Sequence, residues 1–502
     1  MIDSFIYLTN QNKVLLSLQN PRTPLDQNAI KSQQDEKESK QILQILEGEY
    51  KYSESEEEQQ KKDEAAKQLR IIIKNWIQQI NAEKQIENNH GGDLLFFGSY
   101  KLKVNSRGSD IDAVCLCPFY VEREKNFFGD LVHILSQKKE ITELFPIQEA
   151  SVPIIKMQFQ GILFDLSFAR APTQFQSDKI DLTSNQMLLG MDERSCKSFN
   201  GYRVAEWLSK KENIQNYENF QSILKCIKLW AQNRGIYSNI IGYLSGIGWT
   251  ILVSKICQLF PNYSLNQLLE RFFFLYSRWR WQDFPVQVEY IVDDVANSKL
   301  SADQWRPEYK SSMMIITPCF PCMNCAHNVS STTLRIIQEQ LWHGYETICK
   351  IQNGSKNYSD LFKSFKFFKK YKHFLEIKIL ATNKNDYTVW KGHVESGLRK
   401  LTRLFESPQY MNLLEVHPYP SYIENFLDDT QSQKNKYKFQ CKYYYGLMCL
   451  QSENNESINL KEACVYFVEQ LEMYPMNKVL ESMNIQCSHL LRSELNLKEN
   501  MK

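Results

Sequence analysis

Two aspartates separated by a single residue are the first candidates for chemistry in this chain of 502 residues. Asp110 and Asp112 stand at the start of a predicted strand, IDAVCLC, where a period of two places both carboxylates on one face. Two like charges at that spacing need a cation, and Mg²⁺ commonly binds one or two carboxylates together with phosphate oxygens and waters. The pair therefore indicates a divalent-metal site, although so short a motif has little specificity alone.

Two neighbouring segments add to this site. Gly98 and Ser99 follow the apolar run from Leu94 to Phe97 and open a short helical turn, whose N–H groups and hydroxyl could hold a triphosphate. Asp165 lies in the apolar run GILFDLSFAR, where a carboxylate is costly unless it is paired or metal-bound. We expect Asp165 on a neighbouring strand as the third metal ligand. The alternative is an ion pair between Asp165 and a buried Lys or Arg.

The elements that must position these residues follow from hydrophobic periodicity. From Gln33 to about Glu87 a period near 3.6 predicts two amphipathic helices, and we interpret the acidic stretch Ser53–Asp63 between them as a solvent-exposed helix start. After Gly92, short apolar runs predict strands, with a helix over Asn126–Gln137, which is typical of an α+β or α/β domain.

The rest of the chain divides into two further parts. A mainly helical part is predicted over 195–350, and beyond it strands and helices alternate again. The predicted helices are Tyr202–Leu208, Phe220–Asn233, Ile247–Leu259, Leu265–Trp279, Thr332–Ile348, Val389–Phe405 and Lys461–Glu472, and the predicted strands are Phe374–Ala381 and Phe439–Leu450.

Composition excludes several classes of protein. With 43% hydrophobic residues the chain is globular, and 60 Lys and Arg against 58 Asp and Glu leave a net charge of +2, which excludes a histone-like coat on nucleic acid. The odd number of cysteines, 13, favours a reducing compartment. The start of the chain does not resemble a signal peptide. Polar residues interrupt the most apolar stretch, Ile236–Phe260, so we expect a buried helix of a soluble domain there.

The motifs FGSY, GSDID, VPIIK, FDLSFAR, NGYRV, IKLWAQNRGIYSN and ITPCFPCMNCAHNVS, in this order, resemble the eukaryotic messenger-RNA poly(A) polymerases, nucleotidyltransferases of the polymerase-β superfamily. The resemblance runs from about residue 20 to about residue 350. It implies an α+β multidomain chain: a nucleotidyltransferase palm with N-terminal helices (20–198), a helical central domain (199–350) and an RRM-like RNA-binding domain (351–502).

The resemblance also implies roles for individual residues. The catalytic, metal-binding triad is Asp110, Asp112 and Asp165, holding two Mg²⁺ or Mn²⁺ ions that activate the RNA 3′-hydroxyl and stabilise the leaving pyrophosphate. The implied ATP contacts are Phe97, Gly98, Ser99, Ser106, Lys156, Lys228, Tyr237, Asn239, Gly246 and Ile247, and the implied RNA contacts are Val152, Lys366, Lys369, Lys370 and Lys372.

The implied activity is template-independent addition of AMP from ATP to the 3′-OH of RNA, in nuclear messenger-RNA polyadenylation with RNA 3′-end processing factors as partners. Three alternatives stay open: a terminal uridylyltransferase, a surveillance-type poly(A) polymerase, and a catalytically inactive RNA-binding scaffold. Incubating the protein with a 3′-OH oligonucleotide, Mg²⁺ and one NTP at a time would distinguish these alternatives.

Two segments and two single positions need a separate interpretation. Lys363–Ile379 interleaves lysines with Phe and Tyr, which is typical of a single-stranded RNA surface, or of an amphipathic strand with its aromatic side chains in the core. The family usually has Gly at Lys103 and an aromatic residue at Ser151. The residues Cys319, Cys322, Cys325 and His327 have ligand types that suit zinc, but we expect no zinc there, because the family has this segment without a fixed set of cysteines.

Overall fold

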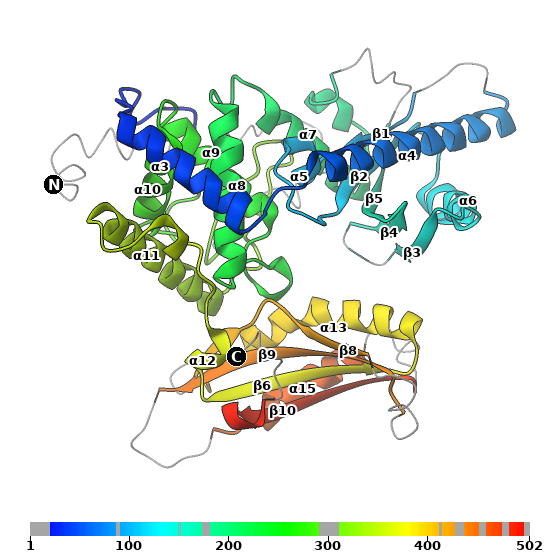
Figure 1. Cartoon of the computed structure of the whole chain (residues 1–502). Coiled ribbons are helices and arrows are strands. Elements are labelled where there is room, and N and C mark those ends of the chain that lie inside the picture. Colours follow the sequence, from blue (N-terminus) through cyan, green and yellow to red (C-terminus); the bar gives the residue numbers. More distant parts are fainter. Residues whose placement is uncertain are drawn as a thin grey trace.

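The computed structural model describes residues 21–86, 91–148, 150, 152–172, 181–290, 311–410, 414–426, 436–450, 458–473 and 481–495. In these ranges the chain forms two five-stranded sheets, with a group of helices between them in sequence (Figure 1). The mixed helix and sheet content agrees with the expected α+β class. Among the described helices, none combines the length and the apolar character needed to cross a bilayer.

The N-terminal sheet has the strand order β1-β2-β5-β4-β3, in which only β2 and β5 pair in parallel. Its parallel pair places the two strands that carry the aspartates side by side. The elements of this part are α3 (Gln33–Gln44), η1 (Ile45–Glu49), α4 (Glu56–Glu83), β1 (Asp93–Phe96), α5 (Gly98–Leu102), β2 (Ile111–Cys117), η2 (Arg123–Leu131), α6 (Val132–Ser136), β3 (Ile141–Ile147), β4 (Ile154–Phe159), β5 (Ile162–Arg170), η3 (Asn185–Leu188) and α7 (Glu193–Ser209).

The two faces of this sheet have different partners because side chains alternate along each strand. In β2, Ala113 and Cys115 belong to the core beneath α4, whereas Val114 and Leu116 belong to the core beneath α7. Asp112 has the same parity as Val114 and so lies on the α7 face. The sheet therefore presents its carboxylates on the side from which the chain continues into the central helices.

Helix α4 begins where the sequence supplies a strong cap. Ser55 and Glu58 form a reciprocal capping box, and acids occupy the first turn, where they favour the helix dipole. The interpretation of the whole acidic stretch as solvent-exposed is wrong for Glu54, whose side chain is only 4% exposed. Glu54 makes a buried ion pair with Lys62, which occupies the first turns of the apolar face of α4.

The central helices bury a large common core that continues into the C-terminal part. The expected helix over Leu265–Trp279 ends earlier than predicted, at Tyr276, and Trp279 packs beyond the helix end against Tyr276 and Trp281. The elements are α8 (Tyr217–Asn233), η4 (Asn239–Ile241), α9 (Gly246–Leu259), α10 (Leu265–Tyr276), α11 (Ser331–Gln352) and η6 (Tyr358–Asp360).

The C-terminal sheet has the order β10-β6-β9-β7, and β8 pairs with the other end of β9. Helix α13 lies between this sheet and the rest of the chain in Figure 1 and contacts η4 of the central part. The elements are α12 (Phe367–Lys370), β6 (His373–Ala381), α13 (Lys384–Phe405), β7 (Leu414–Pro418), β8 (Ile423–Phe426), β9 (Phe439–Cys449), α15 (Lys461–Glu472), β10 (Met483–Leu491) and η7 (Arg492–Glu494).

The expected domain boundaries at 198/199 and 350/351 fall inside α7 and α11 respectively. Both helices continue without interruption across these positions, and the central and C-terminal cores merge. The division into three domains with these bounds therefore stays a prediction, while the packing joins the parts through shared helices.

Candidate active site

The three aspartates of the predicted triad lie on, or directly before, two paired strands. Asp110 directly precedes β2, and Asp112 within β2 stands opposite Asp165 of β5 in the parallel register. Burial raises the pKa of Asp112 to about 7, and the charges of Asp110 and then Asp165 add to the effect. The cluster therefore carries more negative charge than its surroundings accommodate, and it favours binding of a cation.

Lys156 supplies one such cation in this structure. It stands opposite Asp165 across β4 and β5, and its Nζ lies 2.9 Å from Asp165 Oδ2. Burial opposes the charge of Lys156, but the attraction of Asp165, the hydrogen bond to it and the charges of Asp110 and Asp112 together outweigh burial and raise the lysine pKa. Burial likewise raises the pKa of Asp165, against the effect of Lys156. The ion-pair alternative for Asp165 is thus realised, with a lysine whose side chain is about half exposed.

A metal site requires suitable positions of its ligands as well as suitable charge. Across the described ranges, no three His, Cys, Asp or Glu side chains converge closely enough to form a metal-binding group as they stand. The donor types and the mutual repulsion of the three aspartates suit a hard divalent cation, while Lys156 holds Asp165 in this arrangement.

The turn after β1 packs directly against Asp112. The Phe97 N–H donates to the backbone carbonyl of Asp112 at 3.0 Å. Gly98 has a φ of +63°, and a Cβ on it would lie 2.2 Å from Asp112 Oδ2. Only glycine satisfies both the left-handed backbone and this approach. Ser99 follows as the second residue of α5, so the predicted triphosphate turn borders the carboxylates.

The charges of the same carboxylates affect the pKa values of two residues in the central part. Lys228 in α8 is buried and donates to the Val104 carbonyl at 3.1 Å. Burial lowers its pKa to about 8, against the attraction of Asp110 and Asp112. Tyr237 has a pKa raised to about 12 by burial and then by the same two aspartates. The structure thus brings both predicted nucleotide contacts into the electrostatic field of the aspartates.

The remaining predicted nucleotide contacts lie around Tyr237 or on the palm loop. A Cβ on Gly246 would lie 2.9 Å from the Tyr237 hydroxyl, so the first turn of α9 closely borders that ring. Asn239 accepts a hydrogen bond of 2.7 Å from Asn328 Nδ2, and Ile247 packs against the central core. Ser106 lies in the loop before Asp110, where its carbonyl accepts from the Ser109 N–H at 3.0 Å.

The predicted RNA residues are scattered over two regions. Val152 precedes β4, and Ser151 lies outside the described residues. The four lysines in and around α12 are exposed, and Lys370 lies 3.5 Å from Glu339. The aromatic residues between them, including Phe367 and Phe368, are buried in a small core of their own. The segment is a helical turn followed by β6 rather than one amphipathic strand, and those two rings are not exposed for base stacking.

The cysteine-rich segment has other partners. Cys319 and Cys322 are buried in different apolar clusters, and the Cys325 thiol donates to the Ile315 carbonyl at 3.2 Å. The His327 Nδ1 lies 2.9 Å from the Asn324 carbonyl oxygen. Each of these side chains therefore has its own local environment.

Sequence reasoning missed the residues that hold the loop before Asp110. Lys62 donates to the carbonyl of Ser109, the residue next to Asp110, and pairs with Glu54. The sequence did contain a signal: Lys62 continues the buried spacing of Leu69 and Ile73 toward the start of α4. A lysine on the apolar face of a helix is costly unless it is paired, so its position pointed to an internal partner.

Comparisons with known proteins agree along the chain. The family descriptions "Poly(A) polymerase nucleotidyltransferase domain", "Poly(A) polymerase central domain" and "Poly(A) polymerase predicted RNA binding domain" match residues 25–210, 219–364 and 366–427. These matches confirm the expected fold class, a nucleotidyltransferase domain, a central domain and an RNA-binding domain in one α+β chain.

Relatives with curated names match most of the chain. Nuclear poly(A) polymerase 4 of Arabidopsis thaliana is 34% identical over 455 residues, covering 88% of this chain and 59% of the relative. Poly(A) polymerase of Dictyostelium discoideum is 35% identical over 424 residues, covering 82% and 51%. A solved structure of Cid1, described by its RNA terminal uridylyl transferase activity, has a TM-score of 0.43 at 16% identity, covering 66% of this chain and 99% of that one. The chain spans between half and three fifths of the two relatives' lengths, and with all three family descriptions matched in order it belongs to the poly(A) polymerase family.

Proposed function

We propose that this protein is a template-independent polynucleotide adenylyltransferase, which adds AMP from ATP to the 3′-OH of RNA and releases pyrophosphate. One observation gives this proposal its main support. Asp112 stands opposite Asp165 and beside the Gly98 turn, with its pKa raised by burial and then by the neighbouring aspartates, in a chain of the poly(A) polymerase family. Carboxylates crowded in this way beside a tight backbone turn suit the recognition of metal-bound phosphate.

Asp110, Asp112 and Asp165 are the residues that would hold divalent cations, and their charge and hard oxygen donors fit Mg²⁺ or Mn²⁺. Two such ions, when bound, supply activation of the 3′-hydroxyl and charge stabilisation at the leaving pyrophosphate. Lys156, which now pairs with Asp165, is the residue that would contact a phosphate of ATP or of the primer instead. The exposed half of its side chain leaves room for that change of partner.

Residues of the central part complete the nucleotide site. Lys228, with a pKa of about 8, stays mostly protonated at neutral pH and offers positive charge to the triphosphate. Tyr237 keeps its proton and can donate it as a hydrogen bond, because its pKa is raised to about 12. No template selects the base, so we assign that choice to Asn239, Gly246 and Ile247, where Asn328 fixes the Asn239 amide.

The first prediction concerns the choice of nucleotide. With a 3′-OH oligo(A) primer, Mg²⁺ and one NTP at a time, we expect kcat/KM for ATP to exceed that for UTP, CTP and GTP by at least about tenfold, as differences in polar contacts to a base allow. A primer ending in 3′-deoxyadenosine is the control and should not be extended. Comparable kcat/KM for UTP would favour a uridylyltransferase, and no extension with any NTP would favour an RNA-binding scaffold.

A second prediction concerns RNA. Changing Lys366, Lys369, Lys370 and Lys372 together to Gln should weaken primer binding and reduce the slope of log K against log salt by about 0.7 for each lysine–phosphate interaction removed. These side chains are exposed, so the fold should be unaffected. The matched control changes four exposed lysines of α3 and α4, Lys37, Lys40, Lys61 and Lys67, to Gln. Equal salt slopes in both variants would show that the RNA lies elsewhere.

The biological setting is part of the proposal. The Arabidopsis relatives are named nuclear poly(A) polymerases, so we place this protein in the nucleus, acting on RNA 3′ ends beside processing factors. The net charge of +2 gives the whole molecule little general attraction for RNA. Primer recruitment therefore depends on local basic surfaces or on such partners.

A further inference from the structure

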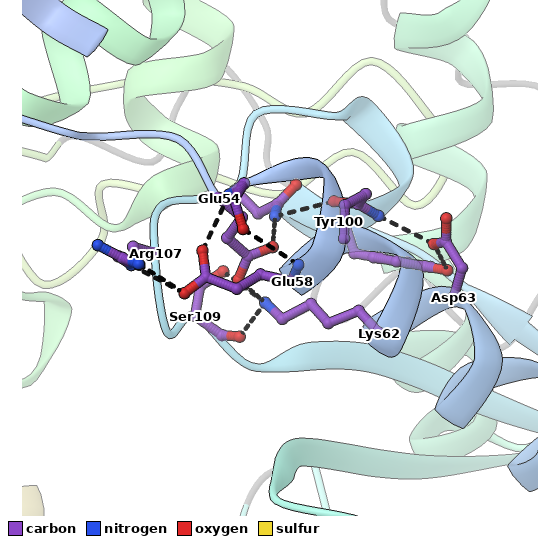
Figure 2. A network of polar contacts seen from close by, with 10 residues as sticks. Glu54, Glu58, Lys62, Asp63, Tyr100, Arg107 and Ser109 are labelled. Carbon is purple, nitrogen blue, oxygen red and sulfur yellow. Dashed lines mark hydrogen bonds and ion pairs between the residues drawn. The ribbon is translucent and has the colours of Figure 1, made fainter. Parts of the chain in front are cut away.

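The loop between α5 and β2 determines where Asp110 lies. It runs from Lys103 to Asp110, has no regular structure, and connects the Gly98 turn to the strand that carries Asp112. A loop of this kind has many accessible conformations, so a metal ligand at its end needs external contacts to stay in place. The contacts come from the start of α4 and the segment just before it (Figure 2).

The central contact is the ion pair between Glu54 and Lys62. Lys62 Nζ lies 2.6 Å from Glu54 Oε1, and both side chains are 4% exposed. The same ammonium donates to the Ser109 carbonyl and lies 3.4 Å from the Ser109 hydroxyl. All three N–H donors of Lys62 therefore have partners, and two of those partners belong to the residue before Asp110.

The second carboxylate oxygen of Glu54 holds the other end of the loop. Glu54 Oε2 accepts a hydrogen bond from Asn105 Nδ2, and Asn105 is itself buried. Next to this network, the Arg107 side chain pairs with Glu58 at 2.8 Å. The backbone N–H of Arg107 donates to the Tyr52 carbonyl at 2.9 Å. Figure 2 shows Glu54, Glu58 and Lys62 gathered beside Arg107 and Ser109 of the loop. One buried ion pair thus contacts the loop at both Asn105 and Ser109.

A buried ion pair contributes little to stability on balance, because desolvation offsets most of the attraction between its charges. A well-packed apolar pair of the same size would hold α4 against the loop about as firmly. What an apolar pair lacks is a directional donor for the Ser109 carbonyl. The network is better explained by the orientation that it imposes on the backbone next to Asp110 than by the stability it adds.

We infer that Glu54 and Lys62 are positioning residues of the nucleotidyl-transfer site: they hold the Ser109 carbonyl, and through it place the Asp110 carboxylate for metal binding. This inference rests on the proposed function for its consequence in catalysis. The contacts of these two side chains are with each other and with the loop. Their effect reaches the reaction through a single peptide unit.

The test removes the pair without leaving a buried charge. In the double variant Glu54→Leu/Lys62→Met, the volume is kept and the Ser109 carbonyl loses its ammonium donor. We expect a Tm within about 4 °C of wild type. Binding of Mn²⁺ in the presence of α,β-methylene-ATP, measured by calorimetry, should weaken at least about fivefold, and kcat should fall at least about tenfold. KM for the RNA primer should stay within about twofold, because the primer lysines lie in another part of the chain.

The matched control is the exposed ion pair Glu57–Lys61 on the same turn of α4, with side chains 78% and 66% exposed. Glu57→Leu/Lys61→Met should bind Mn²⁺ and turn over like wild type. If the double variant of the buried pair unfolds, Glu54→Gln serves instead. It keeps the volume but leaves only one acceptor oxygen for two donors, and should weaken Mn²⁺ binding at least about twofold.

The possible outcomes distinguish a failure of the positioning role of Glu54 and Lys62 from a failure of the proposed function. Wild-type metal affinity and kcat in a folded buried-pair variant, or an equal loss in the control, would overturn the positioning role while leaving the proposed function intact. A wild-type protein that binds Mn²⁺ but adds no nucleotide would refute the proposed function, and weaker Mn²⁺ binding in the buried-pair variant would then still support positioning. Failure of the wild type to bind Mn²⁺ would overturn the positioning role directly.

Discussion

Replacing Asp112 with Asn is expected to lower kcat for nucleotide addition by about 10³-fold or more, a loss of about 4 kcal/mol in transition-state stabilisation. The amide keeps the size of the side chain and removes the charge at the centre of the cluster, opposite Asp165. Single-turnover extension of a labelled oligo(A) primer with ATP measures the loss. Activity within about tenfold of wild type would contradict the metal assignment.

Stability measurements show whether this variant keeps its fold. In the metal-free protein the pKa of Asp112 is raised from 3.8 to about 7, so the folded state holds its proton to higher pH than the unfolded state does. The proton on Asp112 therefore stabilises the folded state fully below a pH of 3.8, and this stabilisation is lost as the pH rises toward about 7. The substituted amide does not ionise, so the metal-free variant should have a Tm at about pH 8 equal to or above that of wild type. Added Mn²⁺ should raise the Tm of wild type and not that of the variant.

Replacing Gly98 with Ala is expected to reduce kcat by about 10²-fold or more, although the substitution adds only a methyl group. The new Cβ would lie 2.2 Å from Asp112 Oδ2, so the carboxylate or the turn has to move. The positive φ of +63° adds a backbone cost of about 1 kcal/mol. A shift of a reacting group by about 1 Å is enough to account for the expected loss.

The matched control for Gly98→Ala is Gly161→Ala in the turn between β4 and β5. Gly161 has a φ of +78°, and a Cβ there would meet no atom within 4 Å. Both substitutions carry the left-handed backbone cost, and only the first displaces Asp112. Comparing their Tm and kcat values therefore separates strain from displacement. Equal kcat values would show that the Gly98 turn does not determine the position of the carboxylate.

Much of the local structure could be predicted because it depends on neighbouring residues. The helix over Lys461–Glu472 was predicted with its observed bounds, and the strands β6 and β9 were predicted to within one residue at each end. The placement of an acid in the middle of an apolar strand also predicted that Asp165 would lie beside the strand of Asp112, and the register shows them opposite each other. Periodicity carries this information within a few residues.

The rest depended on contacts between distant segments. The partner of Asp165 is set by the register of β4 against β5, which brings Lys156 opposite it. The burial of Phe367 and Phe368 depends on strands 50 or more residues later, with which they form a common core. Glu54 looked like one exposed acid among several, and only the approach of the loop at Asn105 and Ser109 makes it internal.

Lys103 stands where the sequence resemblance leads us to expect Gly, and the structure explains that expectation. Lys103 ends α5 with a φ of +56°, a left-handed conformation that glycine adopts without cost. The resemblance led us to expect Gly here, and the left-handed backbone suits that expectation. A lysine at this position costs about 1 kcal/mol, a modest amount for a domain of this size.

The way α8 contacts the palm has a consequence for protein engineering. Gln221 and Lys228 donate to the carbonyl oxygens of Leu102 and Val104, at 2.8 and 3.1 Å, and so recognise backbone rather than side chains. These two hydrogen bonds therefore depend on the donor side chains of α8 and not on which side chains stand at positions 102 and 104. A chimera that combines this palm with the central domain of a relative should therefore keep both contacts, provided that the graft has a Gln and a Lys seven residues apart on its first helix.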